Sequence, residues 1–306
     1  MKEGVYDIFI VVKYIIQVNM ENLETKTKCI MKKYGITANK SLGQNFLINE
    51  EVVNNIVKSS EITKEDLVIE IGPGLGTLTE ELLENAGKVI AIELDDRMIK
   101  ILKDRFVAYN NFEIINEDVL KVDLATLIKN EKQTNNLKNA KIVANLPYYI
   151  TTPIIMKLLE EKLDICSITV MIQKEVADRL IAVPGDKVSG AITYCVYYYA
   201  NSESVMIVDN NSFIPEPEVQ SEVIKLNVRE KPVIEVKDEE FFFKVIKVSF
   251  MQRRKTLINS LVNGGVFKNK EEAKAVFDEL GFELNVRGEN LSILDFGRLS
   301  ERVGGR

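Results

Sequence analysis

The sequence predicts an α/β protein in which a doubly wound, mostly parallel sheet is followed by a small C-terminal helical domain. Short apolar runs that suit buried strands alternate with helix-like segments over most of the chain. The apolar run that ends at Ile71 leads into a glycine-rich turn and then into a helix, which is typical of parallel α/β sheets. After Pro232 the pattern becomes helical, so we place a domain boundary near residue 231.

Length and composition fit a soluble globular protein of two domains. The chain has 306 residues, of which 46% are hydrophobic and 28% charged, so it can form a large core and a smaller second domain. The formal net charge of −6 means that a nucleic-acid partner would need a local basic patch. The three cysteines are far apart without a Cys-x-x-Cys pair, which fits a reducing cytosol and indicates neither a disulfide framework nor a metal site.

Residues 1–19 are predicted to be an upstream extension, because Met20 offers a second translation start. The run from residue 8 to 18 is apolar apart from Lys13 and Gln17, but it is too short to span a bilayer. Acidic residues precede it and no small-residue cleavage site follows it, so we expect neither a signal peptide nor a membrane role. The alternative is an N-terminal helix that packs or frays.

Two polar segments precede the glycine-rich turn. Residues 20–40 are rich in lysine and are expected to form a helix with a solvent-facing side. Residues 40–47 follow, with the sequence Lys-Ser-Leu-Gly-Gln-Asn-Phe-Leu, before a helix that starts near Asn49. This polar, glycine-containing segment is suited to lie over a ligand, although its sequence alone does not name one.

The glycine-rich turn, Gly72-Pro73-Gly74-Leu75-Gly76, lies between a strand and a helix that starts near Thr77. Glycines let the backbone approach a ligand closely, and the next strand ends at Glu93, whose carboxylate can bind the two hydroxyls of a ribose. Compared with the dinucleotide pattern, the third glycine comes one place early, and Glu70 would repel phosphate. These features favour a nucleoside without phosphates, such as S-adenosylmethionine, with Glu70 orienting its cationic amino group through water or backbone. The alternative is a purely structural turn.

Polar residues follow each of the next strands as well. The strand over residues 112–116 is followed by Asp118, whose carboxylate is suited to accept a hydrogen bond from an adenine amine. Residues 128–139, rich in Asn and Lys, are expected to form a surface loop. In parallel α/β sheets, ligands bind at the carboxyl ends of the strands, and Gly72, Glu93, Asp118 and Asn145 all lie at such ends.

The segment Asn145-Leu146-Pro147-Tyr148, at the end of a buried strand, predicts a pocket for a flat amine. The exocyclic amine of adenine is a poor nucleophile, because its lone pair is delocalised into the ring. The amide oxygen of Asn145 and the carbonyl oxygen of Leu146 can each accept one amine N–H, while Tyr148 stacks on the base. No general base is required, and the chain contains no histidine. The alternative is an ordinary proline turn with Tyr148 packed in the core.

The later elements complete the sheet and form the helical domain. A helix is expected over residues 173–183, followed by two antiparallel strands at the sheet edge, over 204–208 and 219–228. The stiff segment Phe213-Ile214-Pro215-Glu216-Pro217 lies between them and either walls the target pocket or is an ordinary rigid loop. Further helices are expected over 270–280 and 293–302. On one continuous helix, four cations would share an arc of roughly 100° and form a basic stripe for phosphate, or simply a solvated face: Lys244, Lys247, Arg254 and Lys255.

Five motifs in this order resemble the small-subunit (16S) ribosomal RNA adenine N6,N6-dimethyltransferases, from about Met20 to the end of the chain. They are Gly43-Gln44-Asn45-Phe46-Leu47, Glu70-Ile71-Gly72-Pro73-Gly74-Leu75-Gly76, Ala144-Asn145-Leu146-Pro147-Tyr148-Tyr149, Gln173-Lys174-Glu175-Val176-Ala177-Asp178-Arg179 and Gln252-Arg253-Arg254-Lys255-Thr256-Leu257. The resemblance implies a Rossmann-like class I methyltransferase sheet over residues 20–230. It also implies that residues 231–306 form a helical domain that docks RNA or the ribosomal subunit.

The implied activity is transfer of methyl groups from S-adenosylmethionine to N6 of two adjacent adenines in the 3′-terminal stem-loop of 16S rRNA. The implied substrate is the small subunit or its precursor, with a further role in subunit maturation. By resemblance, Glu93 binds the ribose and Asp118 the cofactor adenine, and the rest of the cofactor cleft is formed by Gln44, Asn45, Leu47, Gly72, Gly74 and Asn145. We expect a cytoplasmic monomer with no metal ion.

On the target side, the resemblance implies that Asn145 and the Leu146 carbonyl hold the amine, and that Tyr148 and Phe213 lie on opposite faces of the base. Two departures from the family pattern, Ser189 and Glu218, affect only the expected RNA-facing detail. Three alternatives remain: a 23S rRNA adenine methyltransferase of the macrolide-resistance type, a DNA adenine methyltransferase, and a ribosome assembly factor without catalysis. The sequence shows no extra DNA-recognition domain, and the intact acidic and Asn-Leu-Pro-Tyr residues argue against lost chemistry.

Overall fold

The computed structural model describes residues 22–39, 42–252 and 254–304. The proposed extension over 1–19 lies outside the described residues, as do Lys40, Ser41 and Arg253. No helix within the described ranges is long and apolar enough to cross a lipid bilayer.

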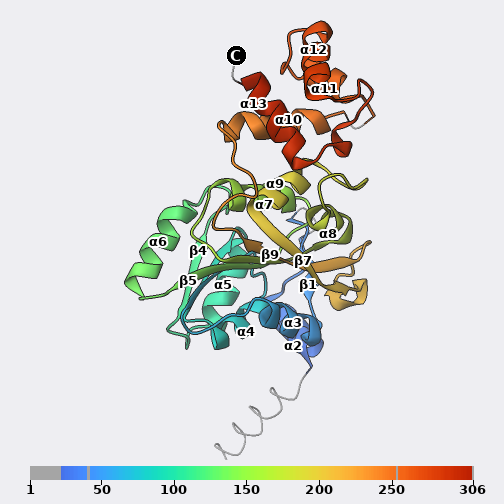
Figure 1. Ribbon diagram of the computed structural model, residues 1–306. Coiled ribbons are helices and arrows are strands. Elements are labelled where there is room, and N and C mark those ends of the chain that lie inside the picture. The colour runs from blue at the N-terminus through green and yellow to red at the C-terminus, as the bar shows by residue number, and fades with distance from the viewer. Residues whose placement is uncertain (1–21, 40–41, 253, 305–306) are drawn as a thin grey trace, which may run out of the picture.

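A seven-stranded sheet forms the centre of the molecule (Figure 1). Its spatial order is β4 (Phe112–Asn116), β3 (Lys88–Glu93), β2 (Asp66–Ile71), β5 (Asn139–Asn145), β6 (Ser167–Gln173), β9 (Ser221–Val228) and β7 (Ala200–Val208). The strands from β4 to β6 are parallel, whereas β9 is antiparallel to both of its neighbours. The predicted doubly wound sheet is therefore confirmed, with the antiparallel strands at one edge.

Helices cover both faces of the sheet, which explains why the central strands read as unbroken apolar runs. In β2, the side chains of Leu67, Ile69 and Ile71 pack into one hydrophobic cluster and that of Val68 into another. The second cluster lies under α2 (Leu23–Tyr34), α3 (Glu50–Ser59), α4 (Thr77–Asn85) and α5 (Asp96–Arg105). The first lies under α6 (Leu124–Thr134), α7 (Thr151–Glu160), α8 (Lys174–Ile181) and α9 (Ala191–Tyr199).

Two of these helices differ from the sequence predictions. The surface loop expected over residues 128–139 is wrong for its first half, because α6 begins at the Asp123 cap and buries Leu124 and Ile128 one turn apart. No helix was predicted over the residues of α9. Its aromatic and β-branched residues are buried on nearly every side, so it shows no amphipathic period that would identify it.

The C-terminal helices form a separate layer above α7 and α9 (Figure 1). They are α10 (Glu239–Phe250), α11 (Leu257–Asn263), α12 (Lys270–Leu280) and α13 (Ile293–Gly304), with a short 3₁₀ turn, η3, at Gly288–Asn290. The predicted helices over 270–280 and 293–302 are thus confirmed. The basic stripe on one continuous helix is wrong, because α10 ends at Phe250 and α11 starts after the Thr256 cap. The exposed Arg254 and Lys255 therefore lie in the connecting loop.

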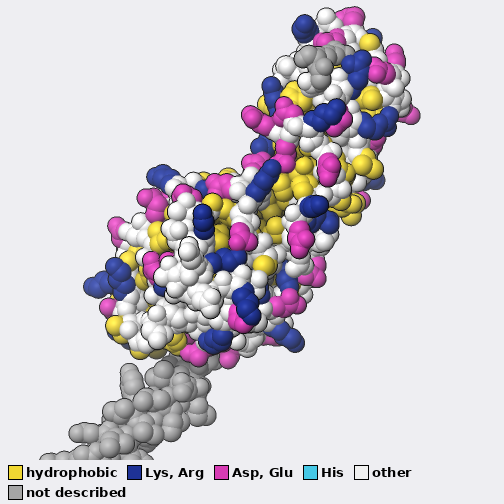
Figure 2. Space-filling view, turned by 60° about the vertical axis from the view of Figure 1, so that its left-hand side comes forward, with side chains coloured by type: hydrophobic (Ala, Val, Ile, Leu, Met, Phe, Trp, Pro, Cys, Tyr) yellow, Lys and Arg dark blue, Asp and Glu magenta, His cyan; other side chains and the backbone are white. Residues whose placement is uncertain are grey.

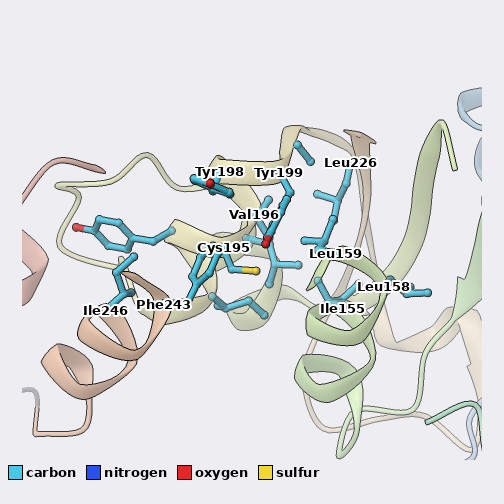
Figure 3. Close-up of a cluster of buried hydrophobic side chains, with 14 of the residues drawn as sticks. Ile155, Leu158, Leu159, Cys195, Val196, Tyr198, Tyr199, Leu226, Phe243 and Ile246 are labelled. Atoms are coloured by element: carbon cyan, nitrogen blue, oxygen red, sulfur yellow. The ribbon is translucent and has the colours of Figure 1, made fainter. Parts of the chain in front are cut away.

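Helices α7, α9 and α10 share one hydrophobic cluster, which joins the C-terminal helices to the sheet (Figure 3). The Tyr194 hydroxyl donates to the Leu291 carbonyl oxygen at 2.5 Å, and the Tyr199 hydroxyl donates to the Glu239 carboxylate. On the face shown in Figure 2, hydrophobic side chains gather at this junction. Burial and buried hydrogen bonds thus fix the helical layer to α9.

Candidate active site at the carboxyl ends of the strands

A cavity that is partly open to solvent lies at the carboxyl ends of β2, β3 and β5 and beside the loop that follows β4. Its lining comes from five separate stretches of the chain, which the sheet topology brings to one edge. Nearly all of the predicted site residues line it: Gln44, Asn45, Leu47, Gly72, Gly74, Glu93, Asp118, Asn145, Leu146 and Tyr148. Phe213 does not.

The glycine-rich turn after β2 forms one wall of the cavity. Gly72 and Gly74 have φ values of 68° and 57°, in the left-handed region that favours glycine, so the turn depends on these residues. A Cβ atom on Gly76 would lie 2.6 Å from the ring of Phe106, which explains the third glycine by packing against α5. The exposed edge of the turn presents backbone to the cavity.

Glu93 lies at the end of β3 and faces the glycine-rich turn. One carboxylate oxygen accepts from the Gly74 backbone N–H at 3.1 Å and the other from the Asp95 N–H at 2.8 Å. Burial raises the pKa of Glu93, although these two N–H groups act in the opposite direction. Because each oxygen has a second lone pair, the carboxylate can still accept from a ligand hydroxyl. Its position fits the predicted ribose contact.

Asp118 and Leu94 form the part of the cavity beyond Glu93. One oxygen of Asp118 accepts from the Leu120 N–H at 3.0 Å, which fixes the carboxylate in the loop after β4. Leu94 is 52% exposed although it is apolar, and it lines the cavity. An apolar surface next to a fixed acceptor suits the face and edge of an adenine ring.

Glu70 lies beneath the glycine-rich turn rather than at an open entrance, which corrects the sequence prediction. It is 1% exposed, and one of its oxygens accepts from the Thr79 hydroxyl at 2.6 Å. Burial raises its pKa to about 8, with Thr79 acting in the opposite direction. Near neutral pH the group is therefore largely protonated, and its bond with Thr79 joins the end of β2 to α4 on the far side of the turn.

The Asn145-Leu146-Pro147-Tyr148 segment forms the opposite wall. The side-chain amide of Asn145 donates to the Asn45 carbonyl oxygen at 3.4 Å, which directs its N–H group to the protein. The Leu146 backbone N–H is bonded to the Met171 carbonyl oxygen at 3.1 Å, across to β6. These bonds fix the two groups whose oxygens were predicted to accept an amine.

Tyr148 is half-buried, and its position is fixed by a residue that sequence reasoning missed. Its hydroxyl lies 2.7 Å from the Ser221 hydroxyl at the start of β9, and burial raises its pKa. Ser221 is far from Tyr148 in sequence and gave no signal as a site residue. The neighbouring Tyr149 is 57% exposed and also lines the cavity.

A segment between α2 and α3 covers the cavity. Its short strand β1 (Phe46–Leu47) pairs antiparallel with β8 (Phe213–Ile214), which follows the 3₁₀ turn η2 (Asn210–Ser212). The Phe46 ring lies near Gly74, where a Cβ atom on the glycine would be 3.6 Å from the ring. The two sequence motifs that contain these strands are therefore joined in space.

Phe213 is the one predicted site residue that the structure does not bring to the cavity wall. Its side chain is 2% exposed and packs with the hydrophobic cluster under α3. Pairing of β8 with β1 turns the side chain into this cluster. In this conformation Phe213 supports the cover of the cavity, and contact with a target base would require the side chain to move.

The lining of the cavity fits a cationic nucleoside cofactor. Among the described residues it includes neither lysine nor arginine, and its acids other than the largely protonated Glu70 are Glu93, Glu117 and Asp118. Such a lining repels phosphate groups and favours a cation such as a sulfonium. Within the described chain, no cluster of residues is suited to hold a metal ion.

Comparisons with known proteins agree with this geometry. Proteins named ribosomal RNA small subunit methyltransferase A are similar to the chain: the one from Clostridium botulinum is 50% identical, covering 90% of this chain and 98% of its own. The one from Bacillus pumilus is 49% identical, covering 90% and 94%.

Two solved structures share the fold. A dimethyladenosine transferase from Plasmodium falciparum has a TM-score of 0.69 at 29% identity and covers 85% of this chain and 98% of its own. The 23S rRNA methyltransferase ErmE has a TM-score of 0.63 at 25% identity, with 85% and 100% covered. A sequence model of the ribosomal RNA adenine dimethylases matches residues 35–303. The chain therefore belongs to the ribosomal RNA adenine dimethylase family.

Proposed function

We propose that this protein transfers methyl groups from S-adenosylmethionine to N6 of two adjacent adenines in the 3′-terminal stem-loop of 16S rRNA. The observation that carries the proposal is that Asn145 and Tyr148 line the same cavity as Glu93 and Asp118. A site for a nucleoside methyl donor and a site for a flat amine therefore lie next to each other. This is the arrangement that group transfer between two bound molecules requires.

On the cofactor side, the residues act by binding and orientation. Glu93 accepts from the ribose hydroxyls, Asp118 accepts from the adenine amine, and Leu94 contacts the ring. Gly72 and Gly74 let the backbone approach the rest of the molecule, because glycine has no side chain to intervene and also adopts the positive φ that the turn requires. When bound, S-adenosylmethionine supplies an activated methyl group that the target nitrogen accepts.

On the target side, the two acceptors raise the reactivity of the amine. The Asn145 Oδ1 and the Leu146 carbonyl oxygen each accept one N–H, which draws the nitrogen lone pair out of conjugation with the ring. Tyr148 stacks on the base and is held by Ser221. The methylated amine loses its proton to water, so no general base is needed. After the first transfer one N–H remains, and one of the two acceptors can still hold it for the second.

The choice of 16S rRNA over 23S rRNA rests on the relatives. Those that are 49–50% identical are named small-subunit methyltransferases, whereas ErmE, at 25%, is named a 23S rRNA methyltransferase. We propose that residues 20–230 form the methyltransferase domain and that residues 231–306 dock the small subunit or its precursor. We further propose that the protein is a cytoplasmic monomer that also acts in subunit maturation.

The experiment that tests this function identifies the product. The protein is incubated with labelled S-adenosylmethionine and small subunits from cells that lack the modification, and the RNA is then digested. We expect dimethyladenosine in the 3′-terminal stem-loop of 16S rRNA. Large subunits serve as the parallel substrate, and labelling of 23S rRNA instead would support the macrolide-resistance type. Cofactor binding without transfer to either subunit would support an assembly factor without catalysis.

A further inference from the structure

The segment that covers the cavity, residues 42–47, contacts both walls, and we call it the strap. At one end, a Cβ atom on Gly43 would lie 3.4 Å from the Tyr149 ring and 3.9 Å from the Tyr148 backbone nitrogen. At the other end, Phe46 lies over Gly74. The strap therefore contacts the target-binding loop and the glycine-rich turn at the same time.

The side chain of Gln44 ties the middle of the strap to the rest of the protein. Its Oε1 atom accepts from the Asn39 backbone N–H at 2.9 Å, and its Nε2 atom donates to Asp95 Oδ2 at 2.9 Å. Both ends of the carboxamide are thus engaged by the protein itself. Gln44 lines the cavity as the sequence predicts, but these polar contacts indicate a role other than direct cofactor binding.

Asp95 is a fixed acceptor for Gln44. Its side chain is 6% exposed and is held by Arg97, whose Nη2 atom lies 2.6 Å from Asp95 Oδ2. Hydrogen bonds from Arg97, and then from Gln44, lower the pKa of Asp95 against the effect of burial. The backbone N–H of Asp95 donates to Glu93, the proposed ribose ligand. Gln44 therefore connects the strap to the cofactor side of the cavity.

The residue after Gln44 connects the strap to the target side. The backbone carbonyl oxygen of Asn45 accepts from the Asn145 side-chain N–H at 3.4 Å. A carboxamide whose N–H is held by a carbonyl has its own oxygen available as an acceptor. The position of the strap thus decides which end of the Asn145 amide is offered to the amine.

We propose that Gln44 is a positioning residue: it latches the strap to Asp95, and through the Asn45 carbonyl it holds the Asn145 amide in the orientation that accepts the target amine. This inference rests on the proposed function, because it assigns Gln44 a part in the same transfer. It predicts that losing the latch slows transfer more than it weakens cofactor binding.

Two single variants and one double variant test the latch. Gln44→Glu places a carboxylate against that of Asp95, and Gln44→Met removes both hydrogen bonds at similar volume. Because misplacement by about 1 Å can cost roughly 100-fold, we expect single-turnover transfer to fall about 10- to 100-fold in both. The dissociation constant of S-adenosylmethionine is expected to stay near the wild-type value. In the Gln44→Glu/Asp95→Asn variant the repulsion between the two carboxylates is removed, so transfer should rise above that of Gln44→Glu, but not to the wild-type rate because the amide N–H at position 95 also faces Arg97.

Amide hydrogen exchange at Asn39 gives a readout that does not depend on transfer. Exchange should be faster in Gln44→Met and return toward wild type in the double variant. Wild-type transfer in both single variants would overturn the proposal. Equal losses of cofactor affinity and transfer rate would also overturn it, since they would show direct cofactor contact. If the wild-type protein transfers no methyl group to small subunits, the proposed function fails. Unchanged hydrogen exchange at the Asn39 amide in Gln44→Met would reject the latch, whatever the result for transfer.

Discussion

The cavity and the C-terminal helices differ in how the chain encodes their polar surfaces. In the cavity, Glu93, Asp118 and Asn145 each follow a different strand, and the order of the parallel strands brings them together. In the helical layer, the charges depend on side-chain pairing: Arg302 lies 2.7 Å from Glu279, and Lys247 is bonded to Glu160 of α7 at 2.9 Å. The residues of a site at strand ends can therefore be predicted from the sequence next to each strand. The free charges of a helical surface cannot be predicted in this way, because they depend on which side chains pair.

Replacing Asn145, the proposed amine acceptor, should give the largest effect and tests whether the strand-end residues form the reactive site. We expect Asn145→Ala to lower methyl transfer about 100-fold or more, because it removes an acceptor that is needed most in the transition state. Cofactor affinity, measured by calorimetry, should change little. Asn135→Ala, at an exposed amide on the far end of α6, is the control and should transfer at the wild-type rate. Normal turnover in Asn145→Ala would remove this residue from the mechanism.

Changing the proposed ribose ligand should affect binding rather than chemistry. Glu93→Gln removes the charge from a group that accepts from the Gly74 and Asp95 backbone N–H groups. Because hydrogen bonds to charged groups contribute about 1.5–3 kcal/mol, we expect the dissociation constant of S-adenosylmethionine to rise about 10- to 100-fold. The control is Glu65→Gln, in an exposed ion pair with Lys138. An unchanged constant in calorimetric titration would show that the cofactor does not depend on Glu93.

The sequence predicts most of the sheet and the cavity, because each strand end carries its own signature. The turn at Gly72, the acid at Glu93 and the amide at Asn145 were all found one motif at a time, and the strap was identified as a possible cover. What the sequence missed depends on contacts between distant segments. Ser221 holds Tyr148 from another strand, and Asp95 holds Gln44 from the end of β3.

Two features of the structure differ from what the sequence suggests. Phe213 was predicted by resemblance to contact the target base; in this structure pairing of β8 with β1 places its ring in the core, and the contact stays a prediction. The basic stripe was predicted by placing residues 244–262 on one helix, where no acidic residue interrupts the cations. Thr256 lies at the N-cap position of α11 without a side-chain capping bond, so its residue type was the available signal of a new helix start.

The corrected position of the two loop cations gives a sharper test of RNA docking. Arg254 and Lys255 are exposed between α10 and α11. If they contact phosphate, the Arg254→Ala/Lys255→Ala variant should raise KM for small subunits a few-fold. The slope of the logarithm of the binding constant against the logarithm of salt concentration should become shallower by about 1 to 2. Lys100→Ala/Lys103→Ala, on exposed positions of α5, is the matched control. Equal salt dependence in both double variants would show that docking uses another surface.

The smallest effect is expected at the junction of the two regions. The Tyr199 hydroxyl donates to Glu239, which also accepts from Lys162 at 3.0 Å, so Tyr199→Phe leaves the carboxylate partly satisfied. Loss of about 1 kcal/mol should lower the melting temperature by about 2–4 °C in calorimetry. Transfer at 25 °C should not change, because Tyr199 lies outside the cavity lining. Tyr197→Phe, at a half-buried position of the same helix, is the control.

This last variant also decides whether the two regions act independently. If Tyr199→Phe lowers only the melting temperature, the junction serves to hold the helical layer on the sheet. If it instead raises KM for small subunits while cofactor affinity and stability are unchanged, the angle between the helical layer and the cavity contributes to docking. Helix α9, which carries no polar signature in the sequence, would then set the distance between the proposed docking surface and the target amine.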